Sequence, residues 1–519
     1  EALADLSRFF WDTVVGGRTF ATGGTTNFEH WRTEWGKLAS ELGPESQETC
    51  CTYNMLKLTK HLFTWRSDVK YADYYERAVL NGILASQDPT TGMMMYYGAL
   101  KGGHWKIFNE HGKCFWCCTG TGFENHVKYG EAIYFHDDDS LTVNLFIASQ
   151  LTWADKGLVV RQETNFPEQE GTNLMFSCEK PVELALHVRV PYWAVNGVIV
   201  KINGIEQDLK AQRGSYLVVE RAWADGDCVA ISMPMSLHLH RMPDDPNVAA
   251  IMYGPVVLAG RLGSDGLDRE MIYIVDQRAM NHADDWPVPH FIVDTDDLNA
   301  WIKPVPGEGL MFHTAGAGDP TDVMLVPLYK ITGERQSVYW TISTAEQWAA
   351  RCAAAAERRR RIAEDRAAFV ETVLDSVIIG DGASEAAHNM QTEGSETGTR
   401  EGRSWREARG GQTFSYDMSI AARPKGKPIA VKCTYWGGDT GRIFHVTVGA
   451  WKIGMVTLNN ERPGEFFEAE YRIPEFLLGE ETLTIGFRAH AGNIAGAVYA
   501  CRIATCWPGP EDDLQPYDD

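Results

Sequence analysis

Residues 115–122 of this chain read Phe-Trp-Cys-Cys-Thr-Gly-Thr-Gly, and a second cysteine pair lies upstream in Glu-Thr-Cys-Cys at residues 48–51. The two motifs place four cysteines and a carboxylate within 71 residues, from Glu48 to Cys118. Thiolates and a carboxylate oxygen are ligands that tetrahedral zinc accepts. Zinc fingers use pairs of the form C-x2-4-C, whereas these motifs need two separate elements that a folded domain brings together. The sequence therefore predicts a metal site in the core of a globular domain.

The composition is that of a large, acidic, globular protein. With 519 residues, of which 44% are hydrophobic, the chain is longer than a single core supports, and we expect three or four domains. A formal net charge of −22 repels nucleic acid and anionic membranes, so we exclude both as partners and favour a neutral ligand. The 17 tryptophans and 19 tyrosines suit the flat faces of sugars, although most aromatic side chains belong to cores.

The other cysteines and the start of the chain bear on where the protein works. Six cysteines beyond Cys118 are scattered singly, which is not a disulfide framework. The sequence has no apolar run of the roughly 18 residues that a membrane helix needs. It opens without methionine or a signal sequence, and we leave open whether a signal peptide precedes it. We favour a bacterial periplasmic or secreted location, with the cytoplasm as the alternative.

Residues 1–135 read as helices joined by long loops. Met55, Leu58 and Leu62 recur at the helical period and predict one apolar helix face. A second stretch with the same period runs through residues 71–84. Both helices are amphipathic, so each needs neighbours that cover its apolar face.

From about residue 140 the hydrophobic period changes from 3.6 to 2. Residues 182–190 alternate apolar and polar side chains, which predicts a half-buried strand. The pairs Asn196-Gly197 and Asn203-Gly204 are typical of two-residue hairpin turns. We assign residues 136–245 to an antiparallel β-sandwich.

The rest of the chain divides into four segments. Thr344 and Gln347 have the spacing of a capping box at the start of a helix, and the arginine run at residues 358–361 reads as the solvated face of that helix. A stretch around Leu483 returns to period 2. The predicted segments are a mostly β segment at 246–343 that closes with a strand at 337–341, a connecting helix at 344–374, a C-terminal β-sandwich accessory domain at 375–507 and an acidic tail at 508–519.

Three motifs together resemble a known enzyme family. They are Thr-Gly-Gly at residues 22–24 followed by Glu29, Glu-Thr-Cys at 48–50, and Trp-Cys-Cys-Thr-Gly-Thr-Gly at 116–122. They are similar to motifs of the β-L-arabinofuranosidases of glycoside hydrolase families 127 and 146, and the resemblance covers nearly the whole chain. It implies a multidomain α + β fold, in which residues 1–135 are the C-terminal part of an (α/α)6-type catalytic barrel and antiparallel β-sandwich domains follow.

The resemblance also implies a chemistry. It is that of a retaining glycoside hydrolase, which releases β-L-arabinofuranose from plant glycans or glycoproteins. Zinc holds a cysteine nucleophile as its thiolate, and a glutamate acts as acid and base. Cys51 and Cys114 have no role in that pattern. By motif, the zinc ligands are Glu48, Cys50, Cys117 and Cys118, the nucleophile is Cys117, the acid/base is Glu29, and Glu76 and Tyr96 contact the sugar.

Several alternatives stay open. A closed four-ligand zinc site also suits a purely structural role. The chain also fits a non-catalytic carbohydrate-binding fragment made of β-sandwiches, or a related glycosidase of different sugar specificity. Only 28 residues precede Glu29, so we expect most of the barrel to be missing. The apolar face of Met55, Leu58 and Leu62 then needs a missing upstream segment or a partner chain to cover it.

Overall fold

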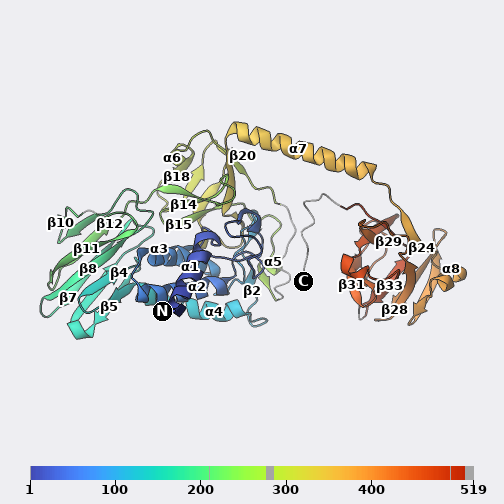
Figure 1. Cartoon of the computed structure of the whole chain (residues 1–519), viewed down its shortest axis with the longest axis horizontal. Helices are drawn as coiled ribbons and strands as arrows, with labels where there is room; N and C mark the ends of the chain where they lie inside the picture. The colour runs from blue at the N-terminus through green and yellow to red at the C-terminus, as the bar shows by residue number, and fades with distance from the viewer. Residues whose placement is uncertain (1, 210, 276–285, 491, 509–519) are drawn as a thin grey trace. The chain divides into compact units, whose positions relative to one another are not determined.

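The computed structural model describes residues 2–209, 211–275, 286–490 and 492–508. The chain divides into two compact units, Glu1–Ala350 and Arg351–Asp519 (Figure 1). Helices and sheets are mixed in the first unit, and the second consists mainly of strands. This confirms a fold that combines helices with several β-sheets. Among the described residues, no helix has the length and apolar character needed to cross a membrane.

The helical part of the first unit carries the cysteine motifs. Its helices are α1 (Ala2–Gly17), α2 (Thr49–Trp65), α3 (Val69–Ala78) and α4 (Cys117–Asn125), with 3-10 turns at Ala39–Glu41, Leu84–Ser86 and Tyr129–Ala132. α3 begins where the Asp68 carboxylate accepts a hydrogen bond from the Lys70 backbone N–H, an interaction that stabilises helix starts. It continues into a π-helical turn at Val79–Ile83, so the helix expected over residues 71–84 is confirmed in outline.

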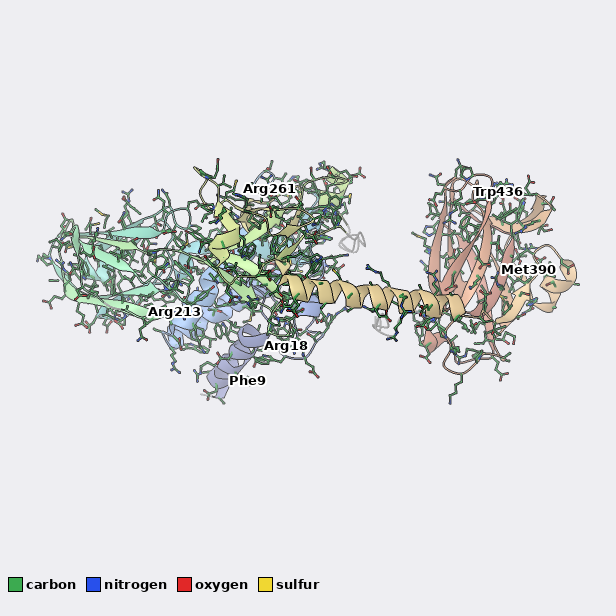
Figure 2. The ribbon with its side chains drawn as sticks, turned by 90° about the horizontal axis from the view of Figure 1, so that it is seen from above. Phe9, Arg18, Arg213, Arg261, Met390 and Trp436 are labelled. Carbon is green, nitrogen blue, oxygen red and sulfur yellow. The ribbon has the colours of Figure 1, made fainter. Side chains whose placement is uncertain are left out.

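The apolar face of α2 is covered within this chain, contrary to expectation. Met55 and Leu62 are buried, and Leu58 is half-buried. They pack in one cluster with Trp11 of α1 and Tyr71 of α3. The expectation that this face needs an upstream segment or a partner is therefore wrong, because α1 and α3 supply the cover. Exposed apolar side chains occur instead on α1. They are Leu3, Leu6, Phe9 and Phe10, and Figure 2 labels Phe9.

A β-sandwich follows the helices. Its strands are β3 (Tyr134–His136), β4 (Ser140–Val143), β5 (Ser149–Trp153), β6 (Leu158–Glu163), β7 (Gly171–Cys178), β8 (Val182–Val190), β9 (Ile199–Ile202), β10 (Ile205–Glu206), β11 (Ser215–Trp223) and β12 (Cys228–Ser232). They form one sheet in the order β10-β9-β12-β7-β6-β5 and another in the order β11-β8-β4-β3, and the inward side chains share one core. β8 buries Leu184, Leu186 and Val188, as its alternation predicts. Asn203-Gly204 forms the expected hairpin, whereas Asn196-Gly197 does not, because β8 and β9 belong to different sheets.

Strands of the third segment form a large sheet, and this sheet also contacts the helical part of the first unit. The strands of this region are β1 (His104–Trp105), β2 (Phe108–Asn109), β13 (Leu237–Arg241), β14 (Val248–Tyr253), β15 (Val256–Arg261), β16 (Tyr273–Ile274), β17 (His290–Ile292), β18 (Ile302–Pro304), β19 (Phe312–Thr314), β20 (Gly318–Asp319), β21 (Met324–Pro327), β22 (Arg335–Ser337) and β23 (Tyr339–Ser343), with short helices α5 (Arg269–Ile272) and α6 (Leu298–Trp301). The strand predicted near residues 337–341 corresponds to β23. β1 pairs with β22, and the buried Asn81 amide bonds to the Pro255 carbonyl at 2.8 Å and to the Val257 N–H at 2.7 Å. These contacts fasten the helical part to the sheet.

The helix that follows this sheet begins as the sequence predicts. α7 (Ala345–Ala368) is preceded by Thr344, whose hydroxyl accepts from the Gln347 N–H at 3.2 Å. The Gln347 side-chain oxygen accepts in turn from the Thr344 N–H at 3.0 Å, which completes a capping box. Arg360 forms ion pairs with Glu357 and Glu364 on the exposed surface of α7, so the arginine run is a solvated helix face.

The second unit is a β domain with its own core. Its strands are β24 (Val373–Val377), β25 (Gln391–Thr392), β26 (Ser395–Arg400), β27 (Arg403–Arg409), β28 (Thr413–Ser419), β29 (Ile429–Trp436), β30 (Arg442–Val448), β31 (Trp451–Leu458), β32 (Phe466–Arg472), β33 (Thr482–Ala489), β34 (Ile494–Val498) and β35 (Ala500–Thr505), with helix α8 (Gly382–Ala387). β33 directs Leu483, Ile485 and Phe487 into the core at period 2. The predicted acidic tail lies outside the described residues except for Pro508.

Candidate active site

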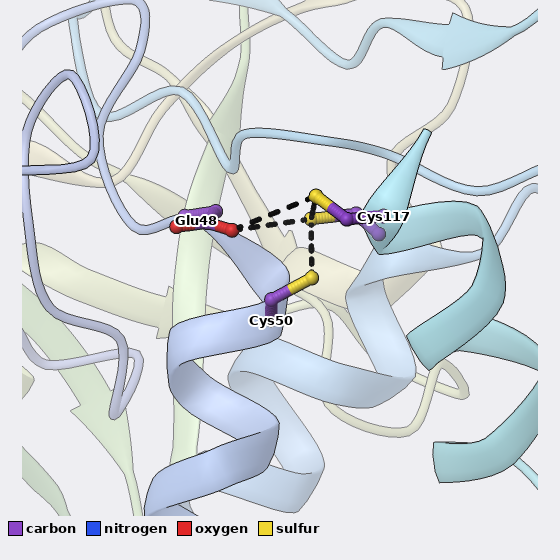
Figure 3. Close-up of side chains that lie close together, drawn as sticks. Glu48, Cys50 and Cys117 are labelled. Carbon is purple, nitrogen blue, oxygen red and sulfur yellow. Dashed lines mark hydrogen bonds between the residues drawn. The ribbon is translucent and has the colours of Figure 1, made fainter. Parts of the chain in front are cut away.

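Two helix starts bring the cysteine motifs together. Cys50 lies in the first turn of α2, two residues after Glu48 at the N-cap position, and Cys117 and Cys118 open α4. Because α2 packs against α4, the two starts meet, and the side chains of Glu48, Cys50 and Cys117 converge (Figure 3). Helix N-termini carry partial positive charge, which favours thiolates and a carboxylate at this position.

The four side chains lie close enough together to share one metal ion. The Glu48 Oε1 atom lies 3.8 Å from Cys118 Sγ and 3.9 Å from Cys117 Sγ, and these two sulfurs are 4.0 Å apart. Cys50 Sγ lies closer to Cys118 Sγ, at 3.0 Å. Ligand atoms of a tetrahedral zinc are about 3.5–3.8 Å apart when the bonds are about 2.0–2.3 Å long. The four ligand atoms all lie within 4.8 Å of one another, so the residues fit a metal ion.

The three thiols differ in exposure and in acidity. Cys118 is fully buried, whereas Cys117 is exposed and therefore accessible to a substrate. Hydrogen bonding to Cys118 lowers the pKa of Cys50. The same hydrogen bond raises the pKa of Cys118, and burial raises the pKa of Cys117. Three neighbouring thiols of this kind do not all ionise at neutral pH unless a cation compensates their charge.

Two further side chains contact the ligand set. The Cys51 thiol donates to Glu48 Oε2 at 3.1 Å, on the carboxylate oxygen that does not face the other cysteines. The Thr121 hydroxyl lies 2.7 Å from Cys50 Sγ and donates to the Cys117 carbonyl at 2.9 Å. Sequence reasoning did not select Thr121, although its position four residues after Cys117 is the spacing for a hydroxyl-to-carbonyl bond on a helix.

Glu29 faces Cys117 across one tyrosine hydroxyl. The Tyr96 hydroxyl donates to the Glu29 carboxylate and lies 3.5 Å from Cys117 Sγ. Burial raises the pKa of Tyr96, so the phenol keeps its proton at neutral pH. Glu29 and the preceding Phe28 have φ values of 64° and 50°, a left-handed backbone that non-glycine residues adopt only where the surroundings enforce it. This tight loop directs the Glu29 side chain toward Tyr96.

Glu45 is a second carboxyl near Glu29, and the motifs did not indicate it. Its side chain is buried, whereas that of Glu29 is exposed. Burial, the largest effect, and the charge of Glu29 together raise the pKa of Glu45 to about 7, against the lowering effect of the Arg32 cation. The Glu45 carbonyl accepts from the Phe28 N–H at 3.1 Å, which ties this segment to the Glu29 loop.

Glu76 was expected to contact the sugar, but its side-chain partners lie outside the cysteine cluster. Its buried carboxylate accepts from the Arg189 guanidinium and from Trp193 Nε1, the latter at 2.9 Å. Arg189 is itself fully buried and pairs with Asp73 at 2.6 Å. The structure thus places Glu76 in the junction between α3 and the β-sandwich. Cys114 is also outside the ligand set, with its sulfur 3.3 Å from the Ile274 carbonyl.

Family models match four successive segments of the chain. Residues 1–131 match the β-L-arabinofuranosidase GH127 catalytic domain, and residues 140–235 match the GH127 middle domain. Residues 238–342 match a domain of unknown function, and residues 368–504 match a family of unknown function. No curated protein matches the chain.

Matching solved structures include a GH127 β-L-arabinofuranosidase from Geobacillus stearothermophilus T6, with 20% identity and a TM-score of 0.48 over 64% of this chain and 55% of that one. A structure described as a glycoside hydrolase matches with 17% identity and a TM-score of 0.49, over 64% of this chain and 61% of its own. The chain thus spans little more than half the length of these structures. The chain therefore carries a GH127 catalytic domain match over its first 131 residues and a GH127 middle domain match over residues 140–235.

Proposed function

We propose that this chain carries the active site of a retaining glycoside hydrolase that releases β-L-arabinofuranose from plant glycans or glycoproteins. The observation that carries the proposal is the four-residue ligand set with Glu29 facing Cys117 across Tyr96. The match of residues 1–131 to the GH127 β-L-arabinofuranosidase catalytic domain supports the choice of sugar. A neutral sugar also suits a chain whose net charge is −22.

The residues of the site have separate tasks in this reaction. Zinc held by the ligand set would keep the cysteine sulfurs deprotonated at neutral pH. Cys117 is the exposed cysteine of the set, and its sulfur attacks the anomeric carbon. As the carbon–sulfur bond forms and the glycosidic carbon–oxygen bond breaks, Glu29 gives its proton to the departing oxygen. Glu29 then removes a proton from water, whose oxygen attacks the same carbon and displaces the sulfur. Two inversions give net retention.

The gap between Glu29 and Cys117 supports retention over inversion. Retaining glycosidases hold their two catalytic groups about 5–5.5 Å apart, whereas inverting enzymes need about 6.5–9.5 Å to admit a water molecule. A single hydroxyl, that of Tyr96, contacts both groups here and lies 3.5 Å from the sulfur. A distance that one hydroxyl group spans falls in the shorter range, which is the range of retaining enzymes. Tyr96 is a positioning residue in this scheme, since its proton holds the Glu29 carboxylate in place.

We further propose that α1 to α4 belong to an (α/α)6-type catalytic barrel, as the family resemblance implies. The apolar side chains that α1 exposes are consistent with such an arrangement. The substrate would be an oligosaccharide or glycan that contains L-arabinofuranose.

Covalent labelling tests the nucleophile and the reaction type. The full chain is incubated with an arabinofuranose-configured cyclophellitol, and the adduct is located by mass spectrometry. We expect one adduct on Cys117, which Cys117→Ala abolishes and the matched control Cys114→Ala retains, because the Cys114 thiol lies outside the ligand set. An adduct on another cysteine would contradict the role of Cys117. Arabinoside binding without any adduct would favour a non-catalytic carbohydrate-binding protein.

A further inference from the structure

Cys51 lies beside the ligand set, but neither the motifs nor the proposed reaction gives it a role. It follows Cys50 directly on α2, where successive side chains point about 100° apart around the helix axis. The four ligand atoms that converge belong to Glu48, Cys50, Cys117 and Cys118, so the Cys51 sulfur is outside this group. The contacts of the half-buried Cys51 thiol indicate a different role.

The Cys51 thiol contacts the carboxylate of Glu48. It donates to Glu48 Oε2 at 3.1 Å. Glu48 is the N-cap residue of α2 and Cys51 is the third residue of that helix, a spacing at which the two side chains can reach each other. The other oxygen, Oε1, lies 3.8 Å from Cys118 Sγ and 3.9 Å from Cys117 Sγ. The two oxygens of Glu48 thus have separate partners, since Oε1 faces the ligand cysteines and Oε2 faces Cys51.

The backbone of Glu48 is held by other segments. Its N–H donates to the Thr26 hydroxyl at 3.4 Å, and the residue forms a β-bridge with Tyr97. Its side chain accepts no N–H from the helix that follows, although oxygen-bearing side chains at this position often do so. Glu48 is only 9% exposed, so water has little access to the carboxylate. The Cys51 thiol therefore takes the place of a backbone N–H as the donor that orients this side chain.

The orientation of Glu48 determines how many ligand atoms the site offers. A carboxylate can bind a metal ion through one oxygen or through both. Three cysteines and one carboxylate oxygen make four ligands, the number that zinc takes in tetrahedral sites, whereas a second oxygen would add a fifth. A hydrogen bond at Oε2 disfavours the second mode, because that oxygen would have to turn away from its donor. Carboxylates that bind metal ions are commonly held by hydrogen bonds of this kind.

We propose that Cys51 is a positioning residue, whose thiol holds Glu48 Oε2 so that Glu48 presents one oxygen to a metal ion. The proposal deepens the proposed function and rests on it only for the ligand set. It gives the two adjacent cysteines different tasks, since Cys50 belongs to the ligand set and Cys51 orients one of the ligands. Loss of an orienting hydrogen bond next to a metal ligand typically weakens metal binding about 10- to 100-fold.

Cobalt titration of the metal-free full chain under reducing conditions tests this role. Alanine and serine are nearly equal in size, but the serine hydroxyl can donate in place of the thiol. We expect Cys51→Ala to weaken cobalt binding about 10- to 100-fold and Cys51→Ser to restore most of the affinity. Cobalt(II) absorbs visible light most strongly in tetrahedral sites. The absorbance per bound cobalt should therefore fall in Cys51→Ala, where Glu48 is free to bind through both oxygens, and recover in Cys51→Ser.

The matched control is Cys114→Ala. The Cys114 thiol lies outside the ligand set and contacts the Ile274 carbonyl at 3.3 Å, so cobalt affinity and absorbance should stay at the wild-type level. If Cys51→Ala fails to fold, Cys51→Ser decides alone. Affinity close to wild type in Cys51→Ser would support the proposal, and a loss of about tenfold or more would overturn it.

Other outcomes would also overturn the proposal. Equal losses in Cys51→Ala and Cys51→Ser would mean that only the size of the side chain matters. Unchanged cobalt affinity and absorbance in Cys51→Ala would mean that Glu48 needs no donor at Oε2. A wild-type chain that binds no cobalt would overturn both the ligand set and the role of Cys51.

Covalent labelling of Cys117 separates this proposal from the proposed function. Labelling of Cys117 together with unchanged cobalt binding in Cys51→Ala would overturn the role of Cys51 and leave the reaction intact. Weaker cobalt binding in Cys51→Ala, restored in Cys51→Ser, would support the role of Cys51 even if Cys117 is not labelled.

Discussion

Replacing Arg189 by methionine would test how the helical part is fastened to the β-sandwich. The guanidinium is fully buried, pairs with Asp73 at 2.6 Å and with Glu76, and donates to the Asn144 carbonyl at 2.6 Å. Burial raises the pKa of Asp73 to about 6 even with this cation beside it. Removing the cation leaves two buried carboxylates without their partner, and breaking a buried pair in this way costs about 3–5 kcal/mol.

We expect Arg189→Met to lower the unfolding temperature of the first unit by about 6–20 °C, at about 2–4 °C per kcal/mol. Differential scanning calorimetry at pH 8 would measure the shift. The deficit should be smaller at pH 5, because protonation of Asp73 then removes a buried charge. The matched control is Arg161→Met, which breaks an exposed pair with Glu163 in the same sandwich and should cost less than about 1 kcal/mol. Equal shifts for the two variants would refute the reasoning.

Three further changes test the site. Cys118→Ser should lower bound zinc, measured by elemental mass spectrometry, far more than Cys114→Ser, and equal losses would contradict the ligand set. The stability that protonated Glu45 contributes is fully present below pH 4.5 and is lost as the pH rises through about 7. In thermal unfolding, Glu45→Gln should therefore stabilise the chain at pH 8 relative to pH 5. An effect of the substitution that is the same at both pH values would contradict the raised pKa of Glu45. Glu29→Gln should abolish turnover of natural glycosides while activated aryl glycosides still label Cys117, and an unchanged rate on the natural substrate would remove Glu29 from the acid/base role.

Local patterns in the sequence were enough to predict many elements and the ligand set. The alternation in β8 and the capping box of Thr344 and Gln347 involve residues a few positions apart, so their spacing alone indicates the structure. The Glu-x-Cys and Cys-Cys motifs indicated a metal site, because few residue types bind a soft metal ion, and the family resemblance indicated which of their side chains would meet. The helix formed by residues 49–65 was predictable from the spacing of its apolar residues, as the strands were from theirs.

Only the tertiary structure decided which groups neutralise one another. Glu76 looked like a carboxylate available to a sugar, but its partner is Arg189, 113 residues further along the chain. The nearness of Glu45 to Glu29, and the cover that α1 and α3 give to α2, likewise arise from packing between segments. A local pattern indicates which face of an element is buried. The energy of a buried charge depends instead on its distance in space from other charges, and that distance exists only once the chain has folded.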